Sequence, residues 1–338
     1  MSPTDFAYHL TGYLAKHLPS QAGLSANTVK SYRDTFILFM RYCVQTRNLK
    51  TEKITLDAIT KELIEDFLAW LETDRGCSRS TRNQRLAAIR GFYRYLQTEA
   101  PEHMHRSQQI AAIPMKKVPQ PSVQYLTLDG IRVILGEPDT RTAAGRRDLV
   151  LLTLLYDTGA RVQELADVAV GDVRLAAPAT VTLTGKGNRR RVVPLMTQTA
   201  KLIGQYLADN ELTHHTHRQR PLFQNRSCAA LTRAGITYIL RKYSSRAHAR
   251  HPELVPKGIS PHCLRHSKAM HLLQAGVNLV YIRDVLGHVS VKTTEVYARA
   301  DSRIKRQALE QAYEPVTASQ MPVWQQNADL IKWLKSLG

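Results

Sequence analysis

The amino-acid sequence predicts a mainly α protein with a small β-sheet, in which a helical bundle is followed by an α+β domain. Apolar residues recur at three- and four-residue steps over residues 5–99, the spacing of one helix face. Two β-prone runs within residues 179–195 flank a glycine-containing turn and predict a hairpin. Three prolines interrupt the pattern within residues 114–124, and a length of 338 residues suits two domains.

Residues 5–99 are expected to form several amphipathic helices. Ser25 to Thr28 and Thr60 offer capping side chains ahead of apolar stripes, and Ser80-Thr81 precedes a third stripe. Any single basic residue on the polar faces is most simply a solvated charge, but their accumulation predicts a bundle that contacts an anionic partner. These residues are Lys30, Arg33, Arg41, Arg79, Arg82, Arg85, Arg90 and Arg94.

The proline-rich stretch is expected to be an extended linker that could cross a DNA groove and join two halves of a clamp. A plain surface loop is the alternative. The predicted organisation is a helical domain over residues 1–113, a linker over 114–124, a second domain over 125–314 and a tail over 315–338.

The second domain combines a buried helix with the hairpin. Thr127 is expected to cap its first helix. Residues 146–157 are very apolar and predict a helix in the centre of the core, and residues 158–165 turn into another helix. The hairpin strands are expected over residues 179–184 and 189–195.

The charge of the chain predicts its partner. A net charge of +19 and a pI near 9.9 indicate an anionic partner, and nucleic acid is the first choice. A ribosomal-type or membrane-surface protein is the alternative.

No apolar run approaches the ~20 residues of a membrane span, and the N-terminus does not resemble a signal peptide. Four scattered cysteines predict reduced thiols in a cytoplasmic protein: Cys43, Cys77, Cys228 and Cys263.

Reactive side chains recur over residues 262–297. His262 and Arg265 are three residues apart and would share one side of a helical turn. Gly287 permits a turn that aims His288, and Tyr297 lies about two turns into the next predicted helix.

These residue types suit cleavage of a phosphodiester. A phenol with a pKa of about 10 is a poor nucleophile unless cations stabilise the developing charge. The planar guanidinium of arginine grips two phosphate oxygens, and lysine or histidine can protonate a departing oxygen. Arg161 and Lys186 would complete the set. Each residue alone has an ordinary explanation, such as a surface ion pair for Arg161, but their combination predicts one site.

Four short motifs are specific in combination. They are Thr158 to Leu165 (TGARVQEL), Gly185 to Asn188 (GKGN) with RVVPL after it, Pro261 to His266 (PHCLRH), and LGH before Tyr297. Together they resemble the tyrosine recombinase (phage integrase) family, including Xer-like recombinases, mobile-element integrases and tyrosine transposases, over nearly the whole chain. The resemblance implies a helical core-binding (SAM-like) domain plus an α+β tyrosine-recombinase catalytic domain.

The resemblance also implies how the phosphate is held. Arg161 and Arg265 would clamp the scissile phosphate, and Lys186 would be the general acid for the leaving 5′ oxygen. Glu164 would have a supporting, structural role.

The remaining roles concern the nucleophile. By the same resemblance, His262 would assist proton transfer at the nucleophile, and His288 would hydrogen-bond the phosphate. Tyr297 would form a covalent 3′-phosphotyrosine, so strand exchange would need no metal, nucleotide or other cofactor.

Two segments depart from the family pattern. Ser267-Lys268 follows His266, where Thr and an aromatic or aliphatic residue are common, which makes the local packing uncertain. Residues 244–258 are long and basic, and predict either an extra DNA-contacting loop or a mobile insertion.

The cluster His214 to His217 lacks an acid or cysteine that would complete a metal site.

Residues 324–337 of the tail predict a short amphipathic helix on a proline-bearing tether. This helix could dock on its own domain or on a neighbouring protomer. The resemblance favours docking on a neighbour, within a tetramer on duplex DNA with paired half-sites. The predicted function is site-specific DNA strand exchange in integration, excision, transposition or resolution. A type IB topoisomerase and a DNA-binding protein without catalysis are the alternatives.

Overall fold

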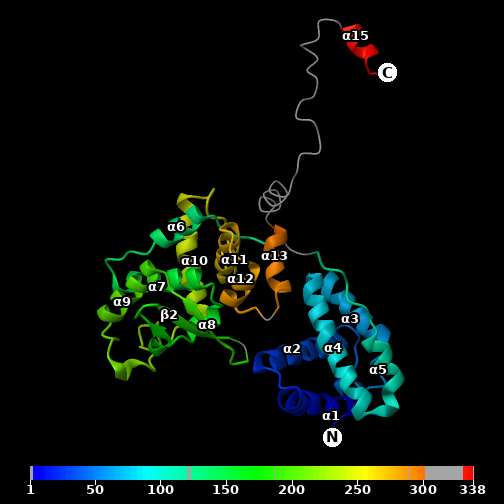
Figure 1. Ribbon diagram of the computed structural model, residues 1–338. Coiled ribbons are helices and arrows are strands. Elements are labelled where there is room, and N and C mark those ends of the chain that lie inside the picture. The colour runs from blue at the N-terminus through cyan, green and yellow to red at the C-terminus, as the bar shows by residue number, and fades with distance from the viewer. Residues whose placement is uncertain (1–2, 120–122, 186, 289, 301–329, 338) are drawn as a thin grey trace. The chain divides into compact units, whose positions relative to one another are not determined.

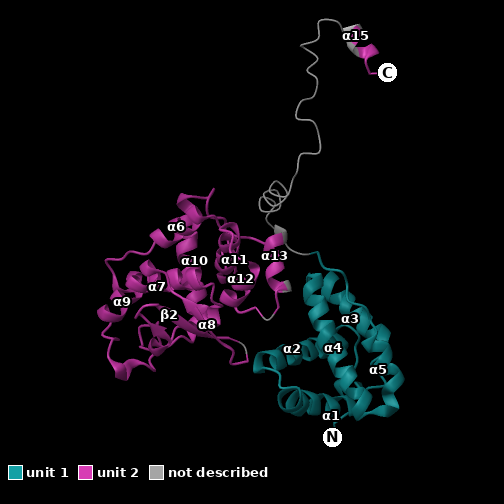
Figure 2. Cartoon of the chain, viewed as in Figure 1, with its two compact units in different colours: residues 1–121 teal, residues 122–338 magenta. Residues whose placement is uncertain are grey.

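The chain forms two compact units, residues 1–121 and 122–338 (Figure 2). The predicted mainly α fold with a small β-sheet is confirmed (Figure 1). The computed structural model describes residues 3–119, 123–185, 187–288, 290–300 and 330–337.

Unit 1 is a bundle of helices. Its longest helices, α2 and α4, pack against each other, and α4 also packs against α3 and α5 (Figure 1). The helices of unit 1 are α1 Asp5–Gly12, the π-helix η1 Tyr13–Gln21, α2 Ala26–Gln45, α3 Lys61–Thr73, α4 Arg79–Glu99 and α5 Met104–Ala111, with short 3₁₀ turns η2 Thr51–Lys53 and η3 Pro101–His103.

Hydroxyl side chains begin these helices. The predicted caps Ser25 and Thr60 are confirmed, since their oxygens accept from the backbone N–H groups three residues ahead at 3.4 and 3.2 Å. The third cap is Ser78, whose hydroxyl accepts from the Thr81 N–H at 3.2 Å. The placement at Ser80-Thr81 was therefore two residues too late.

The core of unit 1 is aromatic. The buried Phe92 ring contacts Phe6, Phe36 and Tyr13 at centroid distances of 5.8, 5.3 and 5.4 Å, mostly edge to face. Such packing buries large apolar area and favours fixed ring orientations. It holds α1, η1, α2 and α4 together.

Two of the arginines assigned to the polar helix faces make structural contacts. Arg82 is buried and donates to the Pro114 carbonyl at 3.1 Å. Arg85 donates to the Ser31 carbonyl and the Thr35 hydroxyl of α2 at 3.2 and 3.0 Å. These contacts satisfy backbone and hydroxyl groups between elements. The prediction that Arg82 is a solvated charge on a polar face is therefore wrong, and Arg85 is half-buried. The exposed basic residues of this set are Lys30, Arg33, Arg41, Arg79 and Arg94.

Unit 2 places helices around a small antiparallel sheet with strand order β1-β2-β3. None of the helices in the described part of the chain combines the length and apolar composition that a membrane crossing requires. The helices and strands of unit 2 are α6 Leu128–Gly136, α7 Ala143–Thr158, α8 Val162–Ala166, η4 Val170–Asp172, β1 Val173–Arg174, β2 Thr180–Thr184, β3 Arg190–Pro194, α9 Thr197–Asp209, η5 His215–His217, α10 Arg233–Arg250, α11 Pro261–Gln274, α12 Leu279–Leu286, α13 Lys292–Ala300 and α15 Leu330–Lys335.

The predicted central helix and hairpin of unit 2 are confirmed. Helix α7 buries residues 150–155 and packs against α9 and α11 (Figure 1). In the hairpin Val181 faces Val193, and both are buried. The cap at Thr127 is confirmed by its bond to the Gly130 N–H at 3.2 Å. The two-residue strand β1 was not predicted, because it is too short to show alternation.

Residues 244–250 form the last turns of α10 rather than an added loop. Arg250 pairs with Glu137 at 3.0 Å, and the His248 Nδ1 atom lies 2.7 Å from the carbonyl oxygen of the buried Val255. Tertiary contacts therefore fix this segment, and the prediction of a loop or mobile insertion is wrong over these residues.

Gly159 ends α7 in the left-handed conformation, with φ +56°. A Cβ there would lie 2.6 Å from Leu286 Cδ2, whereas Gly258, at φ +78°, has open space around its Cα. We expect Gly258→Ala to lower the free energy of unfolding by about 1 kcal/mol through backbone strain alone. Gly159→Ala should cost about 2 kcal/mol or more, because the clash adds to the strain. Denaturant unfolding of both variants checks this, and equal losses would contradict it.

Candidate active site

Arg265 is fixed inside unit 2 by the ends of two other helices. It lies on α11, is 4% exposed, and donates to the carbonyl oxygens of Gly159 and Leu286 at 2.6 and 2.7 Å. These carbonyls end α7 and α12, where helix dipoles favour a cation. Burial and the charge of Arg161 lower the pKa of Arg265 to about 10, so the group stays protonated at neutral pH.

Arg161 and Arg191 share one buried carboxylate. Glu164, 3% exposed, accepts from Arg161 at 2.7 Å and from both terminal nitrogens of Arg191 at 3.0 and 2.7 Å. Burial alone raises the pKa of the Glu164 carboxyl, but the hydrogen bonds from Arg191 and Arg161 outweigh it and hold that pKa below its usual range. The predicted structural role of Glu164 is thus to bind both guanidinium groups.

The same network joins the hairpin to the segment that carries His288. Arg191 on β3 donates to the Val285 carbonyl at 2.9 Å, and Arg161 approaches the Gly287 carbonyl at 3.4 Å. Gly287 itself has φ +66°, and a Cβ there would lie 2.8 Å from an Arg191 terminal nitrogen. A side chain at residue 287 would therefore displace this arginine.

Tyr297 is covered in this structure. Its side chain is 3% exposed, and its hydroxyl lies 2.9 Å from His266 Nδ1. Burial raises the pKa of Tyr297, although the charges of Arg265 and Arg161 act in the opposite direction. The phenol is accordingly protonated at neutral pH.

His288 lies beside the same ring. The His288 and Tyr297 rings are stacked at 6.4 Å between centroids, and His288 Nδ1 lies 3.0 Å from the Thr294 hydroxyl. Burial, together with the charges of Arg265, Arg161 and Arg191, lowers the pKa of His288 to about 4. The imidazole is therefore neutral at physiological pH.

His262 lies on the exposed side of α11, one turn before His266. The two imidazole rings are 6.3 Å apart. Burial lowers the pKa of His262, and the charges of Arg265, Arg161 and Arg233 lower it further. His262 is thus an exposed member of the set, as is the partly exposed Arg161.

Five of the six predicted residues are brought together, through α11, α13 and the ends of α7 and α12. Lys186 lies outside the described residues. Its neighbour Gly185 begins the hairpin turn, where a Cβ would lie 2.9 Å from Glu164 Oε1 and 3.8 Å from an Arg161 terminal nitrogen. The chain therefore enters the turn beside Arg161.

Sequence reasoning gave no role to His266 or Arg191. The four-residue spacing of His262 and His266 was a usable signal, because such residues share a helix face. The pairing of Arg191 with Glu164 had no local signal, since the two residues are 27 positions apart.

The unusual Ser267-Lys268 pair fits the local packing. Ser267 accepts from the Leu126 N–H and donates to the Cys263 carbonyl, both at 2.8 Å. Lys268 lies 3.6 Å from an Asp157 carboxylate oxygen and over the Tyr156 ring. Both residues thus anchor α11 to its neighbours.

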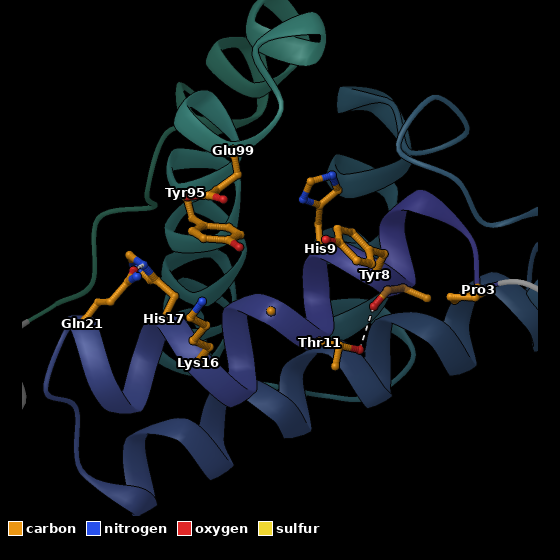
Figure 3. A pocket seen from close by; sticks show the side chains of 11 residues that line it. Pro3, Tyr8, His9, Thr11, Lys16, His17, Gln21, Tyr95 and Glu99 are labelled. Carbon is orange, nitrogen blue, oxygen red and sulfur yellow. Dashed lines mark hydrogen bonds between the residues drawn. The ribbon is translucent and has the colours of Figure 1, made fainter.

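A pocket of about 540 Å³ lies in unit 1, at α1, η1 and α4 (Figure 3). Tyr8, His9, Lys16 and Tyr95 are among the residues around it. It contains none of the predicted catalytic residues, which all belong to unit 2. Over the described ranges, no group of three or more His, Cys, Asp or Glu residues is arranged to hold a metal ion.

Removal of Arg191 tests how much its ion pair with the shared Glu164 carboxylate contributes to stability. We expect Arg191→Met to lower the free energy of unfolding by about 3 kcal/mol, because Glu164 stays buried with fewer donors. The neighbouring Arg190, 64% exposed and 3.6 Å from Asp172, is the matched control, and Arg190→Met should cost less than about 1 kcal/mol. Guanidinium unfolding measures both.

The double variant Glu164→Gln with Arg191→Met should recover part of that loss, since it removes the unpaired charge. Similar stabilities for Arg191→Met and Arg190→Met would contradict the assignment.

Comparison with known proteins identifies the family. The chain matches the phage integrase family over residues 124–303 and the phage integrase N-terminal SAM-like domain over residues 10–100. A Sinorhizobium fredii protein provisionally named integrase/recombinase y4rC is 34% identical over 300 residues, which cover 89% of each chain. Tyrosine recombinase XerD of Listeria innocua is 32% identical over 279 residues, 82% of this chain and 89% of its own.

A solved structure shows the same fold. The XerH site-specific recombinase bound to palindromic difH substrate, a post-cleavage complex, has a TM-score of 0.66 at 22% identity, covering 84% of this chain and 80% of its own. The resemblance indicated by the sequence motifs is confirmed. This chain belongs to the phage integrase family of tyrosine recombinases, enzymes that break and rejoin DNA strands.

Proposed function

We propose that this chain cleaves duplex DNA through Tyr297, conserves the bond energy in a 3′-phosphotyrosine and rejoins the strand to a new partner at a specific site. The observation that carries the proposal is the convergence of two guanidinium groups, two histidines and the Tyr297 hydroxyl around α11. A protein that only binds DNA has no use for a hydroxyl held in that position.

Arg161 and Arg265 are proposed to bind the scissile phosphate. The Arg161 side chain is 39% exposed and can meet a phosphate oxygen, while the buried Arg265 adds a fixed positive charge. Cations held before the reaction stabilise a pentavalent phosphorane without reorganisation at the moment of attack.

The proposed role of His288 is to donate a hydrogen bond. A neutral imidazole that accepts from the Thr294 hydroxyl at Nδ1 carries its proton on Nε2, which can donate to a phosphate oxygen. His262, on the solvent side, is proposed to assist proton transfer around the nucleophile.

Lys186 is proposed as the general acid for the leaving 5′ oxygen. The position of Gly185, the residue before Lys186, supports this role, because Gly185 lies beside Arg161 and Glu164 at the proposed phosphate site. Proton transfer from a positioned lysine then avoids an alkoxide leaving group.

Because Tyr297 is covered, DNA binding is proposed to uncover its hydroxyl before attack. The exposed basic residues of unit 1 are proposed to contact the DNA backbone, with residues 114–124 as the linker between the units. A DNA substrate implies work in the cytoplasm, with the nucleoid.

We also propose a tetramer on paired half-sites, with the C-terminal helix docked on a neighbouring protomer. The amphipathic pattern of residues 324–337 supports docking on an apolar surface. Within this segment the structure describes α15, and residues 324–329 lie outside the described residues.

Covalent capture tests the proposed chemistry. We expect a nicked suicide duplex, carrying a site selected by binding from a random pool, to give a protein–DNA adduct on a denaturing gel. The adduct should form in EDTA and be absent with Tyr297→Phe. Binding without an adduct would indicate a DNA-binding protein, and relaxation of supercoils without sequence preference would indicate a topoisomerase.

Deletion of residues 322–338 tests the proposed assembly. The truncated chain should bind a single half-site with unchanged affinity but form fewer four-protomer complexes, because the docked helix is lost. Native gels and light scattering on DNA measure both. Unchanged assembly would show that the tail serves its own protomer.

A further inference from the structure

The histidine that the structure places at the Tyr297 hydroxyl is His266, not His262. His266 Nδ1 lies 2.9 Å from the Tyr297 hydroxyl oxygen, and the two rings are 5.6 Å apart at 57°. His262 lies one turn earlier, on the exposed side of the helix. The sequence motifs implied one role for a histidine at the nucleophile, and they assigned that role to His262.

Charge and burial prepare His266 to accept a proton. Burial lowers its pKa, and the charges of His262 and Arg265 lower it further, so its imidazole is neutral at neutral pH. A neutral imidazole with its proton on Nε2 presents Nδ1 as an acceptor, to which the phenol donates. The buried phenol keeps its proton until a base takes it.

The surroundings of His266 bring the acceptor and the phosphate site together. His262 and Arg265 face it from α11, His288 from the segment between α12 and α13, and Tyr297 from α13. The charges of Arg265 and Arg161 both act on the Tyr297 hydroxyl, so the acceptor His266 and the proposed phosphate site lie on either side of the same phenol.

We propose that His266 is a further catalytic residue, which accepts the Tyr297 hydroxyl proton as the oxygen attacks phosphorus. The proposal rests on the proposed function. The Tyr297 oxygen forms a bond to phosphorus while the bond from phosphorus to the 5′ oxygen breaks. The phenol proton passes to His266 Nδ1, and the 5′ oxygen leaves with a proton from the general acid.

Rejoining reverses these transfers. The incoming 5′ hydroxyl gives up its proton to the lysine as it attacks, and the His266 imidazolium returns its proton to the departing phenolate. His262 then assists from the solvent side rather than at the hydroxyl.

Single-turnover cleavage of the suicide duplex tests the role. His266→Asn keeps an amide oxygen near the Nδ1 position and can still accept the hydrogen bond, but it cannot take the proton. We expect it to slow adduct formation roughly 100-fold at pH 7, the usual size of a general-base effect. His266→Ala should be at least as slow. A rate for His266→Asn within about threefold of wild type would overturn the proposal, since positioning alone would then suffice.

The pH profile separates proton transfer from packing. The wild-type rate should fall as the pH drops through the His266 pKa, which lies below the ordinary histidine value, and level off above it. The rate of His266→Asn should lack that limb and instead keep rising with pH beyond about pH 10, because the phenol, whose pKa is raised by burial, then ionises without a base. Parallel profiles for the two proteins would overturn the proposal.

A matched control lies on the same helix. His271 of α11 is also part-buried, and its Nδ1 lies 2.8 Å from the Tyr156 hydroxyl. His271→Asn removes a similar histidine–tyrosine pair and should leave the pH profile unchanged. A loss of the acidic limb in this variant would assign the limb to folding and contradict the proposal.

A DNA substrate with a modified leaving group gives an independent test. A 5′-bridging phosphorothiolate needs no general acid, so it should rescue Lys186→Ala but not His266→Asn. Rescue of both would place His266 on the leaving-group side and overturn the assignment. If wild type forms no adduct while binding DNA, the proposed function itself fails, which is distinct from an adduct that forms normally without His266.

Discussion

The buried guanidinium of Arg265 is the constraint on which the site depends. A charge this deep is costly unless hydrogen-bonded, and its two acceptors are carbonyls at the ends of α7 and α12. Those carbonyls are available because Gly159 and Gly287 turn the chain in the left-handed conformation there. The phosphate site and the helix ends therefore form together: a change in either glycine alters the acceptors that hold the charge.

In the candidate active site the arginines outnumber the carboxylates. Arg161 and Arg191 share the single carboxylate of Glu164, while Arg265 binds only carbonyl oxygens in the interactions described. Burial lowers the pKa values of His266 and His288, and the surplus positive charge lowers them further, so both histidines stay neutral. An anion placed here would reduce that repulsion. The site therefore carries unbalanced positive charge, which the proposed DNA phosphate would neutralise.

Sequence reasoning succeeded where the signal is local. The caps at Ser25, Thr60 and Thr127 and the hairpin follow from side chains that bond within a few residues. Near Ser78 two serines stand close together, and local pattern did not decide which of them begins the helix. Capping propensity cannot decide between two residues of the same type.

Long-range contacts account for most of what was missed. Arg82 looked like a surface charge, yet a carbonyl 32 residues away satisfies it. The helical turn spacing placed His262 and His266 on one face, but only the packing of α13 determines that His266 meets Tyr297, 31 residues later. The motif residues were recognisable from the sequence, whereas the partner of the nucleophile required the fold.

The two units hold their basic side chains in different ways, so DNA affinity and the rate of the reaction depend on different residues. The exposed arginines and lysines of unit 1 are free to exchange counterions for phosphates, and binding of that kind weakens steeply with salt. Arg161, Arg191 and Arg265 of unit 2 are held by Glu164 and by helix-end carbonyls, so salt screens them much less. Such fixed charges contribute most where charge develops during the reaction, because they need not reorganise. Salt should therefore regulate whether the chain engages DNA far more than how fast a bound phosphate reacts.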